Sequence, residues 1–191
     1  MINMFEKLIW FFFQSDVKKY LKEEVRERRF VNYSNAKTIL LVFESDFSEQ
    51  NLLIRNIIQQ LVSDGKKVKA WGFVNKKETS SPILQDFRIL HQANLGMLKK
   101  PDKSILDELT LFKSDLLIDL TTTEVIPLKY IVLFANAACK TGLKKPGINL
   151  YDFIVDIKHE KLEDNENDQI VDANTLYNQI IFYLKSIQTT D

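Results

Sequence analysis

The chain has 191 residues, about the length of one domain, and its 26 basic and 26 acidic side chains give a formal net charge of zero. A balanced charge provides no field that would draw the molecule to nucleic acid, so we expect no such partner. The single cysteine, Cys139, excludes an internal disulfide and a cysteine-based zinc cluster, and we expect a reducing, cytoplasmic location.

The N-terminal segment begins with an apolar run, MFEKLIWFFF, that is followed by many basic residues. About ten apolar residues are too few to span a bilayer, and a signal peptide carries its positive charge before the apolar run. No glycine or proline occurs in residues 6–29, which predicts a helix with a break near Ser15 and Asp16. We therefore expect residues 1–34 to form a helical extension.

After this segment, apolar runs alternate with stretches of helical periodicity. The first run, TILLVF, is typical of a strand buried on both faces. We predict strands at residues 38–43, 68–74, 87–91, 115–120, 141–142 and 151–157. We predict helices at residues 48–63, 104–112, 126–139 and 175–187, with Gly65 as the left-handed cap of the first.

Alternating strands and helices favour a parallel sheet with right-handed crossovers and helices on both faces. Residues 35–191 are therefore predicted to form a three-layer, Rossmann-like α/β domain with a mainly parallel sheet.

The segments FKSDLLIDLTTTEVIPLKYIVLFANAACKTG and YDFIVDI, with TILLVF and the basic N-terminal helix, resemble a family of small uncharacterised bacterial proteins. The resemblance covers nearly the whole chain and implies a Rossmann-like fold without a known activity. Residues 115–142 also resemble, locally, the N-terminal half of lipopolysaccharide heptosyltransferases. Those enzymes have a second Rossmann domain and a glycine-bearing first loop, and this chain has neither.

Open α/β sheets bind ligands beyond the carboxyl ends of their strands, which selects residues 44–48, 75–81 and 121–124. Neither G-x-G-x-x-G nor the phosphate-binding loop G-x-x-x-x-G-K-[ST] occurs. The first loop instead carries Glu44 and Asp46, with Glu49 close behind, and these carboxylates repel phosphate. We expect no binding of NAD or ATP and no cofactor.

Two groups of residues are candidates for a ligand site. Thr121, Thr122 and Thr123 precede a predicted helix, where hydroxyls and free amides can hold an anion; alternatively, Thr122 or Thr123 caps that helix and Glu124 suits its dipole. Asp119 and Asp156 end two strands and can either form a two-carboxylate site or bind loop amides.

The histidines, the cysteine and the serine motifs of the sequence do not indicate a metal site, a reactive thiolate or a serine hydrolase. His91 and His159, the two histidines, have no linking motif, so we predict structural roles and no metal site. Cys139 is predicted near a helix C-terminus, where the dipole disfavours a thiolate. No G-x-S-x-G motif occurs, which makes a conventional hydrolase improbable.

The aromatic residues of the N-terminal segment are the remaining functional candidates. Phe5, Trp10, Phe12 and Phe13 are interpreted as contacts to a partner or a membrane surface. The favoured alternative is that Phe5, Leu8, Ile9, Phe12 and Phe13 pack on the protein's own domain or on a second copy in a homodimer.

These patterns indicate a non-catalytic binding or interaction module as the leading function. The alternatives are a sugar- or nucleotide-handling transferase and a peripheral membrane adaptor that uses the N-terminal helix.

Overall fold

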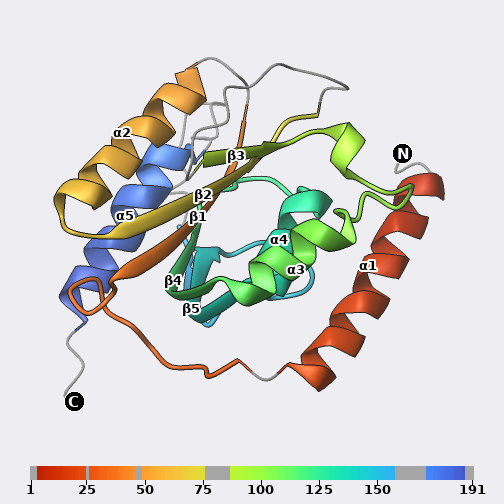
Figure 1. Ribbon diagram of the computed structural model, residues 1–191, viewed down its shortest axis with the longest axis horizontal. Helices are drawn as coiled ribbons and strands as arrows, with labels where there is room; N and C mark the ends of the chain where they lie inside the picture. Colours follow the sequence, from red (N-terminus) through yellow and green to blue (C-terminus); the bar gives the residue numbers. More distant parts are fainter. Residues whose placement is uncertain (1–3, 25, 46–48, 76–86, 158–170, 188–191) are drawn as a thin grey trace, which may run out of the picture.

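The computed structural model describes residues 4–24, 26–45, 49–75, 87–157 and 171–187. Its centre is a six-stranded sheet in which every neighbouring pair of strands is parallel, in the order β3-β2-β1-β4-β5-β6 (Figure 1). The strands are β1 (Thr38–Glu44), β2 (Lys67–Phe73), β3 (Phe87–Leu90), β4 (Lys113–Asp119), β5 (Asn136–Leu143) and β6 (Phe153–Val155). The predicted Rossmann-like α/β fold is confirmed.

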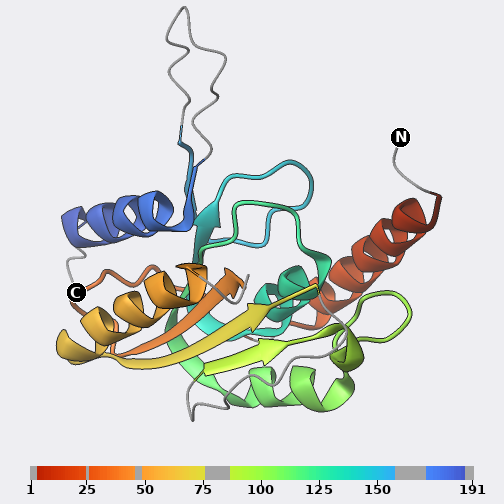
Figure 2. The same cartoon turned by 90° about the horizontal axis from the view of Figure 1, so that it is seen from above.

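Helices cover both faces of this sheet (Figures 1 and 2). The helices are α1 (Met4–Glu23), α2 (Glu49–Ser63), α3 (Lys103–Leu111), α4 (Ile126–Phe134) and α5 (Ala173–Ser186), with a short 3-10 turn, η1 (Gln92–Asn94). Buried residues of α2 and α5 share one core cluster, and those of α1, α3 and α4 share the other. The sheet therefore separates two cores, and α1 lies on the α4 side.

Strand β1 shows how the sequence positions the centre of the sheet. Five of its residues, Ile39–Phe43, are fully buried, because alternate side chains enter the two cores. Ile39, Leu41 and Phe43 point to the α2 side, whereas Leu40 and Val42 point to the α4 side. A run that is apolar at every position is thus required here, which is why the sequence identified this strand.

The predicted helix over residues 126–139 is too long. Helix α4 ends at Phe134, Ala135 has extended backbone, and Asn136 begins β5. Strand β5 pairs with both β4 and β6, so these residues fill a place in the sheet that a helix would leave open. Cys139 consequently lies in a central strand and is fully buried, not near a helix terminus.

The predicted break in the N-terminal helix is also wrong. Helix α1 continues through Ser15 and Asp16 and ends at Glu23. The Asp16 carboxylate does not cap a second helix, because it accepts hydrogen bonds of 2.8 Å from Tyr130 Oη of α4 and from Lys100 Nζ. These contacts hold α1 against the neighbouring elements.

The inner face of α1 is part of the core. Ile9, Phe13 and Val17 are buried, and the Phe13 ring meets Tyr130 edge-on at 5.0 Å between centroids. Phe5, Leu8 and Phe12 were expected to pack on the protein's own domain or on a second copy; in the single chain they are exposed, and their packing on a second copy stays a prediction. Trp10 is half-buried.

Residues after α1 run as an extended linker along the amino-terminal edge of the sheet to β1 (Figure 1). Arg29 N donates to Ala138 O of β5 at 3.1 Å, and Tyr33 N donates to Leu184 O of α5 at 3.0 Å. The linker therefore crosses from the α4 side of the sheet to the α5 side and is bonded to both.

Candidate ligand site at the carboxyl edge of the sheet

The strand order reverses at the centre of the sheet, where β1 and β4 are neighbours. Helix α2 follows β1 on one face and α4 follows β4 on the other, so the chain leaves this edge in opposite directions. Such a switch point opens a crevice at the carboxyl ends of the two strands, which is where ligands bind in open α/β sheets.

The predicted anion loop lies at this point, and a carboxylate of the protein occupies it. Glu44, the last residue of β1, accepts hydrogen bonds from Thr122 N at 3.2 Å and from Thr123 N at 3.1 Å. Thr123 Oγ1 lies 3.0 Å from both Glu44 oxygens. The backbone amides of Thr122 and Thr123, which could otherwise bind a phosphate, thus donate to the carboxylate of Glu44.

Neither Thr122 nor Thr123 caps a helix. Helix α4 begins at Ile126, its N-cap is Val125, and no side-chain capping bond is made there. The predicted capping role is therefore wrong. The backbone amides of Thr122 and Thr123, which precede the helix, donate to Glu44.

Asp119 is buried at the end of β4 and binds loop donors. Its carboxylate accepts 2.8 Å and 2.5 Å hydrogen bonds from Thr121 N and from Tyr151 Oη, and Lys145 Nζ lies at 3.7 Å. Burial and the Asp119 charge raise the pKa of Tyr151 above its ordinary value, so this phenol is a firm donor. The Tyr151 ring covers Gly142, where an added Cβ would lie 2.7 Å from ring carbons.

The structure does not bring Asp156 to this cluster. Strand β5 separates β4 from β6, and Asp156 follows β6. Its carboxylate pairs with Lys144 Nζ at 2.6 Å on the surface. Asp119 and Asp156 thus have separate partners.

A pocket of about 750 Å³ opens beside Glu44. The ends of β1 and β2, the first turns of α1, the loop after η1 and the start of α4 form its walls. The lining residues are Phe5, Glu6, Ile9, Trp10, Glu44, Ser45, Phe73, Asn75, Gln92, Leu95, Gly96, Met97, Lys99, Glu124, Val125, Ile126 and Pro127. Three carboxylates and one lysine line it, so its electrostatic character is acidic.

An internal ion pair lies at the wall of this pocket. The buried Lys129 of α4 pairs with Glu124, and its ammonium lies 5.0 Å from the centroid of the Trp10 ring. A cation over an indole face is attracted by the ring quadrupole. Trp10 therefore contacts the protein's own domain, and the same combination of carboxylate and aromatic ring lines the pocket.

The other candidate residues from the sequence, His91 and Cys139, lie outside both clusters described above. His91 directly follows β3, and its backbone N donates to Asn94 Oδ1 at 2.9 Å. Burial raises the pKa of the Cys139 thiol, which keeps it protonated and unreactive. Asp46, His159 and residues 76–81 lie outside the described residues. Within the described ranges, no group of three or more His, Cys, Asp or Glu side chains has a metal-binding arrangement.

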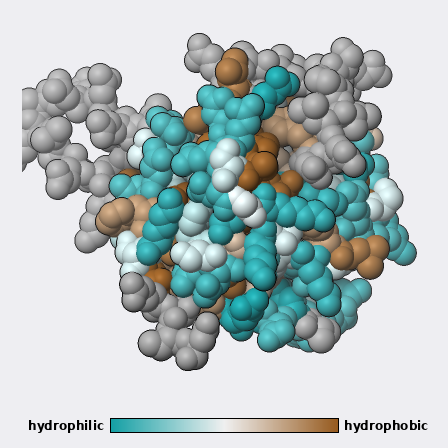
Figure 3. Space-filling model, turned by 60° about the vertical axis from the view of Figure 1, so that its left-hand side comes forward, coloured by the Kyte–Doolittle hydropathy of each residue, from teal (hydrophilic) through white to brown (hydrophobic). Residues whose placement is uncertain are grey.

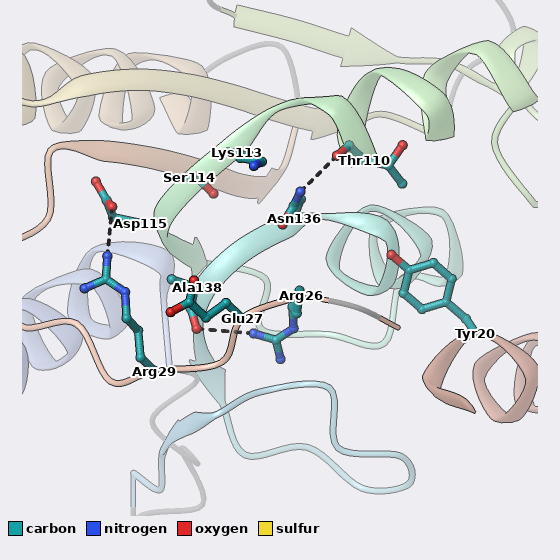
Figure 4. A pocket seen from close by; sticks show the side chains of 10 residues that line it. All are labelled: Tyr20, Arg26, Glu27, Arg29, Thr110, Lys113, Ser114, Asp115, Asn136 and Ala138. Atoms are coloured by element: carbon teal, nitrogen blue, oxygen red, sulfur yellow. Dashed lines mark hydrogen bonds and ion pairs between the residues drawn. The ribbon is translucent and has the colours of Figure 1, made fainter. Parts of the chain in front are cut away.

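A second pocket, of about 490 Å³, lies at the opposite edge of the sheet beside the linker (Figure 4). Its lining residues are Tyr20, Arg26, Glu27, Arg29, Thr110, Lys113, Ser114, Asp115, Asn136 and Ala138. Arg29 points to Asp115 at 3.6 Å, and Asn136 Nδ2 donates to Thr110 O at 3.1 Å (Figure 4). Because these groups bond to one another, we interpret this pocket as the seam along which the linker attaches.

A buried ionic cluster adjoins this seam, and sequence analysis missed it. Arg26 makes a bidentate pair with Asp152 at 2.7 and 2.8 Å and also binds Glu24 at 2.7 Å. The buried Lys140 lies 3.7 Å from Glu24, and its ammonium donates to Leu133 O at 3.0 Å. Because residues 24–26 are far from residues 140 and 152 in the sequence, no local motif predicts the cluster.

Burial sets the charge balance of this cluster. Removal from water, with the nearby Arg26 guanidinium, lowers the pKa of Lys140 to about 7. Burial would raise the pKa of Asp152, but the Arg26 hydrogen bonds outweigh it and lower that pKa below its ordinary value. The cluster therefore joins the linker to β5, and the charge of Arg26 influences the pKa values of both Lys140 and Asp152.

Comparison with protein families identifies one match, a model described as a family of unknown function (DUF6913), over residues 11–187. The chain belongs to this family. The match begins within α1 and ends after α5, so it includes the sheet, most of α1, the pocket beside the linker and the lining of the carboxyl-edge pocket except Phe5, Glu6, Ile9 and Trp10. Neither the curated proteins nor the solved structures contain a match, and the comparisons thus provide no support for the likeness to heptosyltransferases.

Proposed function

We propose that this protein is a binding module that holds a small, donor-rich molecule in the pocket at the carboxyl edge of the sheet. The observation that carries the proposal is the position of Glu44. In a nucleotide-binding Rossmann domain, free amides at the switch point receive the phosphates. Here the amides of Thr122 and Thr123 donate to Glu44, and the pocket beside them is acidic.

The walls of the pocket favour a particular ligand chemistry. Glu6, Glu44 and Glu124 outnumber Lys99 and the Lys129 that pairs with Glu124 by one charge, which favours positive charge or hydrogen-bond donors over phosphate or carboxylate groups. Phe73 and the other apolar side chains offer hydrophobic contact for the rest of the molecule. The ligand class is therefore a small organic amine or polyol amine with an apolar part.

Thermal-shift measurements on the full chain test this proposal. ATP, NAD and UDP-glucose at about 1 mM are compared with a panel of aliphatic and aromatic amines at the same concentration. A ligand with a Kd of about 1 µM would then stabilise the protein by about 4 kcal/mol, which is readily detected. We expect at least one amine to stabilise the protein and the nucleotides to leave its melting temperature unchanged.

A pair of variants tests whether the pocket holds the amine. Met97→Trp places a large ring in the pocket wall, whereas Leu111→Trp changes an equally exposed residue outside both pockets. We expect Met97→Trp to abolish the stabilisation by the amine and Leu111→Trp to retain it. Stabilisation by a nucleotide or UDP-glucose would contradict the proposal and favour the transferase alternative; no stabilisation by any amine would contradict the assigned ligand class.

A further inference from the structure

The outer face of α1 is apolar over its first half. Met4, Leu8 and Phe11 lie three or four residues apart, and their exposed fractions are 85%, 45% and 66%. The opposite face of the same helix is buried against the core through Ile9 and Phe13. The helix is therefore held in place from one side, and its exposed apolar residues are presented as a stripe.

Exposed aromatic pairs occur on two of the described helices, α1 and α5. Figure 3 brings forward the side on which α2 and α5 lie, and that surface is mainly hydrophilic with smaller hydrophobic areas between. On α1, Phe11 and Phe12 are adjacent, both exposed, and meet edge-on at 5.7 Å, as Phe182 and Tyr183 of α5 do at 5.4 Å. Contiguous exposed aromatic residues mark an interaction surface.

The second half of the same face is basic. Lys18, Lys19 and Lys22 are exposed and continue the stripe of Phe11 toward the end of α1, and Lys7 flanks its apolar half. Among the described residues, no carboxylate forms an ion pair with these lysines. The face thus combines bulky apolar side chains with unneutralised ammonium groups.

Folding removes part of the nearby negative charge from this face. Glu24 has a side chain only 3% exposed and pairs with Arg26 and Arg28, while Asp16 pairs with Lys100 on the inner side. Of the exposed acids of α1, Glu6 lies about 100° or more around the helix from the stripe, whereas Glu23 follows Lys19 by four residues and lies on the same side, at about 3.6 residues per turn. Counting charges along the sequence therefore underestimates how basic this face is.

We propose that the outer face of α1 docks on an anionic lipid surface. The exposed apolar residues Met4, Leu8, Phe11 and Phe12 enter the interface between headgroups and acyl chains, and Lys18, Lys19 and Lys22 lie over the acidic headgroups. Apolar insertion and attraction to anionic lipid are the two terms that bind interfacial helices. In the described part of the chain no helix is long and apolar enough to cross a bilayer.

A second copy of the chain fits this face less well. Two such faces would bring Lys18, Lys19 and Lys22 of each copy together with Glu23 as the one carboxylate on each, and an excess of like charge in an interface is unfavourable. An anionic lipid surface supplies the complementary charge and also accepts the aromatic side chains. The proposal is independent of the ligand proposed for the carboxyl-edge pocket.

Vesicle co-sedimentation with the full chain tests the proposal. The vesicles contain either phosphatidylcholine alone or phosphatidylcholine with phosphatidylglycerol, at a salt concentration of about 0.1 M. We expect binding to the anionic vesicles only. The double variant Lys18→Gln/Lys22→Gln should weaken it about 30-fold, which corresponds to about 1 kcal/mol per lysine near the surface.

Two further variants complete the test. Lys67→Gln/Lys103→Gln removes two exposed lysines on other elements and should bind as the unmodified chain does, since its net charge equals that of the first double variant. Phe11→Ser should also reduce binding without changing the melting temperature, because this side chain is exposed. Absent binding, equal losses in both double variants, or a dimer in light scattering that Phe11→Ser dissociates would each overturn the proposal.

Discussion

Glu44 at the end of β1 accepts hydrogen bonds from both the backbone N and the Oγ1 of Thr123 in the loop after β4. This contact joins the two central strands at the point where the fold would otherwise bind a phosphate. It explains how a Rossmann-like sheet without a glycine-rich loop satisfies the amides at its switch point, and it leads to the first prediction.

Replacing Glu44 by Ala should destabilise the protein by about 1–3 kcal/mol, because the loop donors lose their acceptor. Inorganic phosphate at about 10 mM should then stabilise the variant more than the unmodified chain, since the amides become free for an anion. Chemical denaturation with and without phosphate measures both effects. Glu108→Ala is the control: its surface pair with Arg88 should contribute less than about 1 kcal/mol, with no phosphate effect.

The pair between Arg26 and Asp152 should be a major contributor to linker attachment. Asp152→Asn removes the charge that balances the buried guanidinium, and we expect a loss of about 3 kcal/mol in the free energy of unfolding. Asp156→Asn breaks the exposed pair with Lys144 and should cost less than about 1 kcal/mol. Urea denaturation of the two variants makes the comparison, and similar losses in both would contradict it.

Lys140 should make the stability depend on pH. Its pKa is lowered to about 7 in the folded protein, so between pH 7 and about 10 the unfolded chain holds a proton that the folded chain lacks. Stability therefore rises with pH through this window, with a slope of at most about 1.4 kcal/mol per pH unit from this group.

The variant Lys140→Met lacks this titration. Its free energy of unfolding should consequently rise less than that of the unmodified chain between pH 7 and 10. Denaturation at several pH values gives the difference between the two curves. Parallel curves would show that the folded-state pKa of Lys140 is close to its ordinary value.

Phe13 should be essential to the stability of the core although it belongs to the N-terminal segment. Its ring is fully buried against Tyr130, and Phe13→Ala should cost about 3–5 kcal/mol. Phe11→Ala, two residues away on the exposed face, should change stability by less than about 0.5 kcal/mol. Thermal and chemical denaturation compare them, and an unchanged Phe13→Ala protein would mean that α1 does not pack as described.

Much of the fold could be predicted because burial on both faces forces an apolar run. The runs at residues 38–43 and 115–120 have this character and form the two central strands. The residues of β5, NAACKTGL, lack it, and a helical period extends into them from α4. Their strand conformation follows from the place between β4 and β6, which no local pattern records.

The candidate site was predicted in part. The rule that ligands bind at the carboxyl edge selected Glu44 and residues 121–124, and these residues do lie together. The hydrogen bonds between them could not be predicted without the strand order, which makes β1 and β4 neighbours although about 70 residues separate them. The walls that α1 and the loop after η1 add to the pocket likewise follow from packing.

The α/β class, the two central strands and the absence of glycine-rich phosphate motifs follow from the amino-acid sequence alone, because each depends on residues close together in the chain. Which charges meet follows from the packing of distant segments. It buries Glu24 with Arg26 and Lys140 and turns Glu44 toward the threonine loop, while the lysines of α1 stay exposed. The physical reason is that electrostatic pairing depends on distance in space and on access to water, and both are set only when distant segments pack.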